Sequence, residues 1–268
     1  MHEAQVIGAV RCHRNFCEDA LLGQPQRGPQ LSHLDTAIKR SGTFTRVGEK
    51  SFKAHRVYDR LAMLVAITTV VGSISYKAID VGANIGPLVL IALIVALGTG
   101  LAGSFRPHLS PKVAIPYALA EGVLLGAISK SYANVSGGIV TMAIVGTSAF
   151  FVSCLFLFRS GIVKVTPRFV QMVGAASLAF FIMLILSLVG LPIPGVGDLR
   201  GGGALLIGVF GLAIGLGSLF VDFERIRRIE EDGTMTANAE WFLALQLMMS
   251  LVMVYINLLR ILGASSRR

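Results

Sequence analysis

The chain has 268 residues, of which 54% are hydrophobic and only 15% are charged, and its mean hydropathy is +0.71. Water-soluble domains of this length are far more polar, so the composition excludes a soluble globular protein. The net charge of +9 would suit nucleic acid, but the basic residues gather beside apolar segments. Topology and contact with anionic lipid explain that placement, so the sequence predicts a lipid bilayer as partner and no nucleic acid.

Residues 1–56 differ in kind from the rest, because they are polar and basic and contain no signal-peptide core. We expect them to form a largely disordered cytoplasmic tail. Cys12 and Cys17 flank His13 there, but the C-x4-C spacing has no second ligand pair. No stable metal site and no cofactor are predicted.

Seven apolar stretches follow the tail, each close to the roughly 20 residues that a bilayer core requires. Backbone groups in lipid must be satisfied internally, so each stretch is expected to be a helix. The predicted spans are 60–76, 84–104, 113–133, 138–158, 169–190, 203–222 and 241–262. The sequence thus predicts an all-α integral membrane domain over residues 57–263 and a short C-terminal tail over 264–268.

Basic residues are unevenly spread over the loops, and Lys and Arg accumulate on the cytoplasmic side. The richer loops contain Arg106, Lys112, Arg159, Lys164, Arg168, Arg225, Arg227 and Arg228. The thinner ones contain Lys77, Lys130 and Arg200. We therefore expect a multi-pass plasma-membrane protein with its N-terminus in the cytoplasm and its C-terminus outside.

Glu121 lies in the middle of the third span. A carboxylate inside a bilayer costs at least roughly 2.5 kcal/mol, so an intramembrane acid is a candidate functional residue. The alternative is a structural hydrogen bond to a neighbouring helix. Gly122 and Gly126 form a G-x-x-x-G pattern beside it, which favours close approach of another helix and places Glu121 inside the bundle.

The sixth span carries a second small-residue face and a second acid. Gly208, Gly211 and Gly215 share one face, as in closely packed membrane helices. Asp222 follows at the cytoplasmic boundary, ahead of a mixed-charge segment that runs to about Glu240. Two interpretations are equally open: Asp222 is a solvated end-of-helix residue, or its apolar neighbours draw it into the bundle.

Other motifs favour structure over chemistry. Thr166 and Pro167 are typical of an N-cap and a first helical position, so they predict the start of the fifth helix. Cys154, inside a span, is more simply a packing residue than a reactive thiol.

The chain has no G-x-S-x-G and no H-E-x-x-H motif, and its histidines lie outside the core spans. An enzyme is not expected and no catalytic residue is assigned; a coupled transporter stays open, although no inverted repeat is evident.

Four segments together resemble the Bax inhibitor family, in its bacterial YccA-like branch. They are Y-A-L-A-E-G-V-L-L-G (117–126), V-T-P-R-F (165–169), F-V-D-F-E-R-I (220–226) and Y-I-N-L-L-R-I-L-G (255–263). The resemblance, which covers about residues 57–263, implies a bundle in which six helices surround a central seventh. For some members it also implies a pH-sensitive calcium leak, held closed by two aspartates that share a proton.

This chain departs from that pattern at one of the two aspartates. Asp222 matches the first, but the second position corresponds to Ser250. A hydrogen bond between the two is possible whereas a shared-proton pair is not, so a steep pH gate is not expected. Asn257, two turns further along, supplies either a polar substitute or a packing hydrogen bond.

Two functions are compatible with these residues. The first is a passive cation or calcium leak, in which Glu121 and Asp222 attract the ion and Ser250, Asn257 and water complete a weak, transient calcium site. The second is an interaction protein that modulates a membrane-bound protease or another membrane partner through the basic tail, because a YccA-like member is associated with restraining such a protease. Loss of the tail would abolish the second function and spare the first.

Overall fold

The computed structural model describes residues 54–80, 86–163, 165–188, 202–232 and 237–266. Almost all of this part of the chain is helical, and it contains no strand. The predicted tail, with Cys12, His13 and Cys17, lies outside the described residues except for its last three positions, so the expectations about it stay predictions.

Seven helices are long and apolar enough to cross a membrane, which confirms the all-α membrane fold and the number of spans. A short 3-10 helix, η1 (Pro107–Leu109), precedes one of them. The seven are α3 (Ala54–Asp80), α4 (Gly86–Phe105), α5 (Ser110–Ala133), α6 (Ile139–Arg159), α7 (Pro167–Leu188), α8 (Gly202–Asp232) and α9 (Ala237–Ser265).

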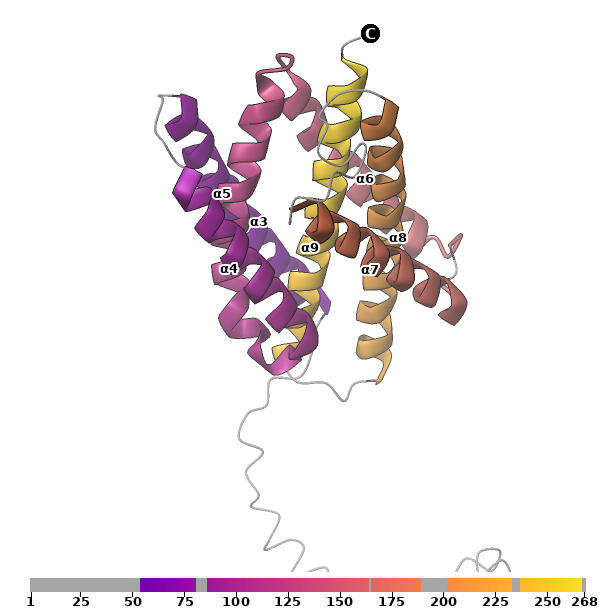
Figure 1. Ribbon diagram of the computed structural model, residues 1–268. Coiled ribbons are helices and arrows are strands. Elements are labelled where there is room, and N and C mark those ends of the chain that lie inside the picture. The colour runs from indigo at the N-terminus through magenta and orange to yellow at the C-terminus, as the bar shows by residue number, and fades with distance from the viewer. Residues whose placement is uncertain (1–53, 81–85, 164, 189–201, 233–236, 267–268) are drawn as a thin grey trace, which may run out of the picture. The chain divides into compact units, whose positions relative to one another are not determined.

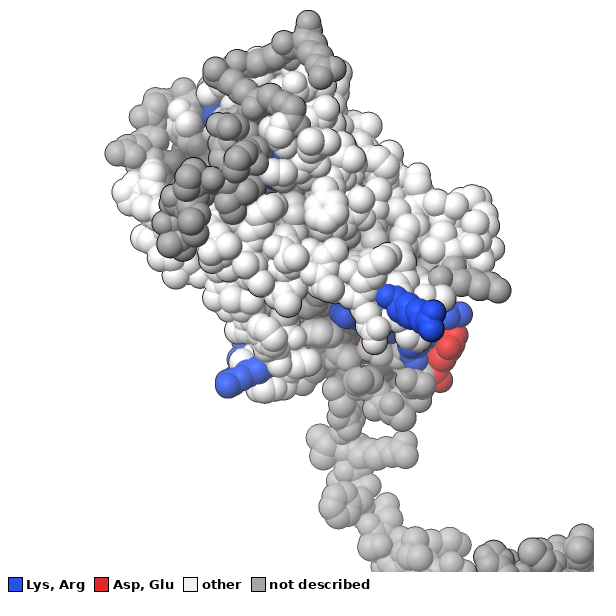
Figure 2. Space-filling model, turned by 45° about the vertical axis from the view of Figure 1, so that its right-hand side comes forward, with Lys and Arg blue, Asp and Glu red and all other residues white. Residues whose placement is uncertain are grey.

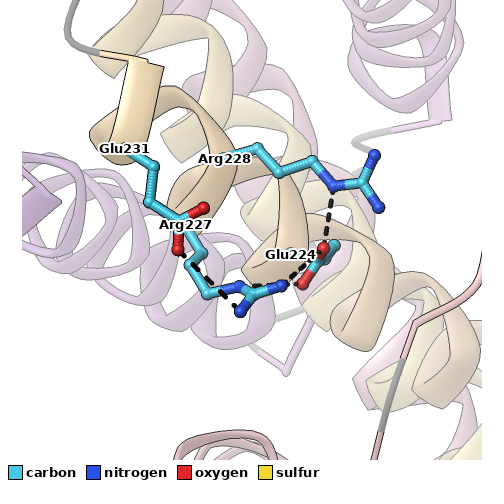
Figure 3. A network of polar contacts seen from close by, with 4 residues as sticks. All are labelled: Glu224, Arg227, Arg228 and Glu231. Atoms are coloured by element: carbon cyan, nitrogen blue, oxygen red, sulfur yellow. Dashed lines mark hydrogen bonds and ion pairs between the residues drawn. The ribbon is translucent and has the colours of Figure 1, made fainter.

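Helix α8 is longer than its predicted span, because it continues through the mixed-charge segment to Asp232. Glu224 accepts hydrogen bonds from Arg227 at 2.9 Å and from Arg228 at 2.7 Å, and Arg227 also pairs with Glu231 at 3.8 Å (Figure 3). Pairs three and four residues apart support a helix outside the apolar core. Hydropathy alone therefore placed the end of this helix about ten residues too early.

Helix α7 begins where the sequence predicted. Its first residue is Pro167, and the backbone N–H of Phe169 donates to the Thr166 hydroxyl at 3.3 Å. This bond satisfies one of the free N–H groups at the helix start, as expected of an N-cap.

Helix α9 runs through the middle of the bundle between α5 and α8 (Figure 1) and packs against α3, α4, α5, α6 and α8. Its fully buried side chains, which form much of the apolar core, are Leu243, Leu245, Leu247, Met248, Val254 and Leu259. Cys154 of α6 is buried in the same core. Because neighbours cover α9 on most sides, its polar residues face protein rather than lipid.

Helix α7 stands apart from this arrangement. Among the described residues it packs only against α8 and makes no contact with α9, and it lies obliquely across the bundle (Figure 1). Helix α9 thus contacts five of the other six helices over the described residues, and the expectation that six helices surround a central seventh stays a prediction. A cavity, described below, occupies the space between α7 and α9.

Glycines set the closest helix contacts. A Cβ added at Gly122 would lie 2.9 Å from the Thr68 carbonyl oxygen of α3, and one added at Gly126 would lie 2.5 Å from that of Gly72. A Cβ added at Gly215 would lie 2.9 Å from Val254 of α9. These helices can approach because the side chains are missing, which is how small residues act in membrane bundles.

The charged residues of the described surface lie toward the helix ends. Figure 2 shows a broad band without Lys, Arg, Asp or Glu, with charged side chains gathered below it. Most of the exposed large apolar side chains belong to α4, α6 and α7, as expected for helices that contact hydrocarbon.

Candidate functional site

A cavity of about 440 Å³ lies between α7, α8 and α9. Three of the residues predicted to form the site, Asp222, Ser250 and Asn257, all line it. The opposite wall comes from α7 and is mainly apolar, with Phe180 and Phe181 among its residues. The tertiary structure thus brings together polar groups that are up to 35 positions apart in the sequence.

The shortest polar contact in the cavity joins α8 to α9. The Ser250 hydroxyl donates a hydrogen bond of 2.6 Å to Oδ2 of Asp222, and both residues are buried. Oδ1 of the same carboxylate lies 4.0 Å from the Arg225 guanidinium, one turn further along α8. Asp222 is only 4% exposed, so the interpretation that it is drawn into the bundle is the one that the structure favours.

Asn257 lies on the same side of α9 as Ser250. Its Nδ2 donates to the Met253 carbonyl at 2.8 Å, and its amide packs directly over Gly211 of α8. Its Oδ1 is buried and has no hydrogen-bond partner among the described residues. A buried carbonyl oxygen without a donor is costly, which makes this atom a candidate ligand for a cation or water.

Arg260 was not singled out from the sequence, although it lines the same cavity one turn beyond Asn257. Its Nη1 is buried without a hydrogen-bond partner among the described residues, and its charge also acts on Tyr132 of α5. The signal was present, because an arginine inside an apolar helix marks a functional position in membrane proteins. The cavity therefore has the Asp222 carboxylate with the Arg225 guanidinium toward one end and the Arg260 guanidinium toward the other.

Glu121 lies elsewhere. It is buried on α5, lines neither this cavity nor the larger one described below, and interacts with the Tyr117 side chain one turn earlier. Over the residues that the structure describes, helices α5 and α8 do not contact each other. Glu121 and Asp222 thus occupy separate places in the bundle.

Met249 lies between these two places. It lines the cavity, and its Cε lies beside the Tyr117 ring over Gly100 of α4. The Ser104 hydroxyl contacts its Sδ at 3.9 Å. An apolar side chain therefore stands between the Glu121 and Tyr117 pair and the Asp222 cavity.

The remaining predicted residues are structural in placement. Gly208, Gly211 and Gly215 form the face of α8 that α9 covers, and Gly122 and Gly126 form the face of α5 that α3 covers. Within the described part of the chain, no three His, Cys, Asp or Glu side chains gather in one place. The polar lining of the cavity consists of one carboxylate, three serine hydroxyls, two side-chain amides and the guanidinium groups of Arg225 and Arg260. One carboxylate with neutral oxygen ligands can attract a hard cation but holds it weakly.

A family profile described as "Bax inhibitor 1 like" matches residues 34–267. No curated protein matches the chain.

Proposed function

Because the chain belongs to the Bax inhibitor family, we propose that it is a passive leak for cations, calcium among them, in which Asp222 supplies the attracting charge. The observation that carries this proposal is a buried carboxylate in a cavity between membrane helices, bonded to Ser250 of the neighbouring helix. Intramembrane acids that face a cavity commonly mark ion pathways. The proposal assigns no enzymatic activity.

The contacts around Asp222 suit a closed state. The Ser250 bond ties α8 to α9 and occupies one carboxylate oxygen, while Arg225 faces the other at 4.0 Å. A cation that enters must displace the Ser250 hydroxyl from the carboxylate. It would find the Asn257 amide oxygen further along α9, so several weak oxygen ligands follow one another, as conduction requires.

The proposed gate has one acid where the resemblance implied two. Protonation of Asp222 would remove the negative charge of the cavity, but no second carboxylate faces it among the described lining residues. A single carboxylate titrates in one step, whereas two neighbouring carboxylates lose their protons in two separate steps. We therefore propose a leak whose response to pH follows the titration of Asp222 alone. The same proposal places the protein in the plasma membrane with its N-terminus in the cytoplasm.

Calcium uptake into liposomes that contain the purified full-length protein tests this function. The comparison is between wild type, Asp222→Asn and Glu231→Gln, at mildly acidic and mildly alkaline pH. Uptake above that of empty liposomes, reduced in Asp222→Asn and unchanged in Glu231→Gln, supports the leak. Glu231 is a matched control because it is an exposed acid on the same helix. Uptake equal to that of empty liposomes at both pH values contradicts the proposed leak.

A second candidate is an interaction protein that binds another membrane protein, for example a membrane-bound protease. The exposure of α7 favours this candidate. Only 6% of the residues in the apolar, membrane-spanning stretch of α7 are buried, and no helix besides α8 packs on it within the described residues. The basic tail, residues 1–56, is the proposed handle. Deletion of residues 2–53 should leave liposome uptake intact if the leak is the function, and should abolish association with a membrane partner if the second candidate holds.

A further inference from the structure

A second and larger cavity lies on a different side of the bundle from Asp222. Its volume is about 730 Å³, and it is lined by α3, α5, α6 and α9. Helices α3 and α6 both contact α5 and α9, but their described residues do not contact each other. The cavity is therefore open between α3 and α6, toward the surface that hydrocarbon covers.

The body of this cavity offers apolar surface. Most of its hydroxyl groups already have partners inside the protein: for example, Ser129 and Tyr255 share a hydrogen bond of 2.8 Å, and Thr147 donates to the Ala143 carbonyl at 2.8 Å. Apolar side chains such as Val65 and Ile144 line the walls. Among the described lining residues there is no acidic side chain. This lining suits a hydrocarbon chain better than a bare cation.

One end of the cavity is cationic. Lys77, near the end of α3, belongs to the lining. Lys130 of α5 places its Nζ 4.9 Å from the ring centre of Tyr76, which also lines the cavity. Gly137 and Gly138, which join α5 to α6, line this same end. Both cations thus lie where the helices end, at the depth of lipid headgroups.

The length of the cavity matches one leaflet. The lining residues of α3 run from Val65 to Lys77. At a rise of 1.5 Å per residue this segment is about 18 Å long, slightly more than half of the roughly 30 Å hydrocarbon core. An occupant with its charged group at Lys77 would therefore reach about as far as the bilayer midplane.

We propose that this cavity binds one anionic phospholipid of the surrounding bilayer, with an acyl chain between α3 and α6 and its phosphate against Lys77. An acyl chain is kept out of water both in the bilayer and in the cavity, so burial of the chain does not distinguish one lipid from another. Charge distinguishes the lipids, because Lys77 and Lys130 attract an anionic headgroup more strongly than a zwitterionic one.

Native mass spectrometry of the full-length protein, purified in detergent and supplied with an equal mixture of phosphatidylglycerol and phosphatidylcholine, tests this site. We expect one phosphatidylglycerol to remain bound to the wild type. Two variants change the two parts of the site separately: Lys77→Gln removes the charge at the cationic end, and Ile144→Trp fills the apolar part of the cavity. Each should lower the bound phosphatidylglycerol several-fold, and Lys77→Arg should retain it.

Matched controls exist for both variants. Lys112→Gln removes an exposed lysine at the other end of the bundle, and Val145→Trp adds the same bulk on the lipid-facing side of α6, where Val145 is 63% exposed and does not line the cavity. Both should bind phosphatidylglycerol as the wild type does.

The proposal is overturned if the wild type shows no preference for phosphatidylglycerol, or if Lys112→Gln loses the lipid as strongly as Lys77→Gln. If Ile144→Trp lowers the melting temperature, Lys77→Gln decides the matter, because an exposed lysine is replaced without change in packing. The measurement does not depend on ion flux, so its result stands whether or not the protein conducts.

Discussion

Ser250 donates a 2.6 Å hydrogen bond to Asp222, and this contact ties α9 to α8 inside a cavity of the membrane domain. The two residues lie 28 positions apart. Because a charged acceptor strengthens a hydrogen bond, the contact stabilises the packing of the two helices as well as the orientation of the carboxylate. A variant that lacks this hydrogen bond can show whether the bond only stabilises the helix packing or also keeps the leak closed.

Ser250→Ala should increase calcium uptake into liposomes if the bond holds the leak closed. The substitution leaves a buried acceptor without its donor, which costs roughly 1–3 kcal/mol, so the melting temperature should also fall. Ser250→Thr keeps a hydroxyl and is the control. A lower melting temperature with unchanged uptake would show that the bond is only structural.

Ser250→Asp should divide the pH response into two steps. The change places a second carboxylate beside Asp222, and two carboxylates in a poorly solvated site cannot both be ionised cheaply, so they share a proton. Calcium uptake measured across a series of pH values should change over a wider interval than in the wild type. Identical pH profiles in both proteins would exclude Asp222 as the gating group.

Gly126→Ala should destabilise the contact between α3 and α5. The added Cβ would lie 2.5 Å from the Gly72 carbonyl oxygen and 2.7 Å from the Ser75 Cβ, and overpacking of this kind costs roughly 1–3 kcal/mol. Gly98→Ala is the control, because nothing among the described residues lies within 4 Å of its Cβ position. Thermal unfolding in detergent should show a lower midpoint for the first variant and an equal or higher one for the second. Equal midpoints would mean that α3 and α5 can move apart freely.

Glu240→Gln should weaken the link between α9 and α3. Glu240 is fully buried, and its carboxylate lies 2.6 Å from Arg60 and 3.5 Å from Arg56. Arg60 also stacks on Trp241, 4.7 Å from the ring centre. Loss of the buried charge should cost roughly 1–3 kcal/mol of stability, since two guanidinium groups lose their anionic partner.

The matched control for that variant is Glu231→Gln, which breaks an exposed pair with Arg227 and should change the unfolding midpoint little. If both variants unfold at the same temperature, the Glu240 contact contributes no more than a surface pair. Tryptophan fluorescence adds a local readout, because Trp241 is the one tryptophan of the chain.

Much of the membrane domain was predictable from the sequence, because hydropathy is a property of each segment by itself. Seven apolar stretches gave seven helices, and Thr166 with Pro167 gave the start of α7. Asp222 and Ser250 were paired through a resemblance, and the structure brings them into contact. The end of α8 was wrong, because the pairs of Glu224 with Arg227 and Arg228 extend the helix beyond its apolar part.

Which helices meet was decided only by the tertiary structure. Apolar membrane helices have no strong polar face, so periodicity does not show which side meets which neighbour. Nothing along the chain indicated that Glu121 lies away from Asp222 or that the described parts of α3 and α6 stay apart. These relations depend on close contacts between two helix surfaces, such as the contact of Asn257 with Gly211. The sequence by itself determined the membrane spans and the candidate polar residues.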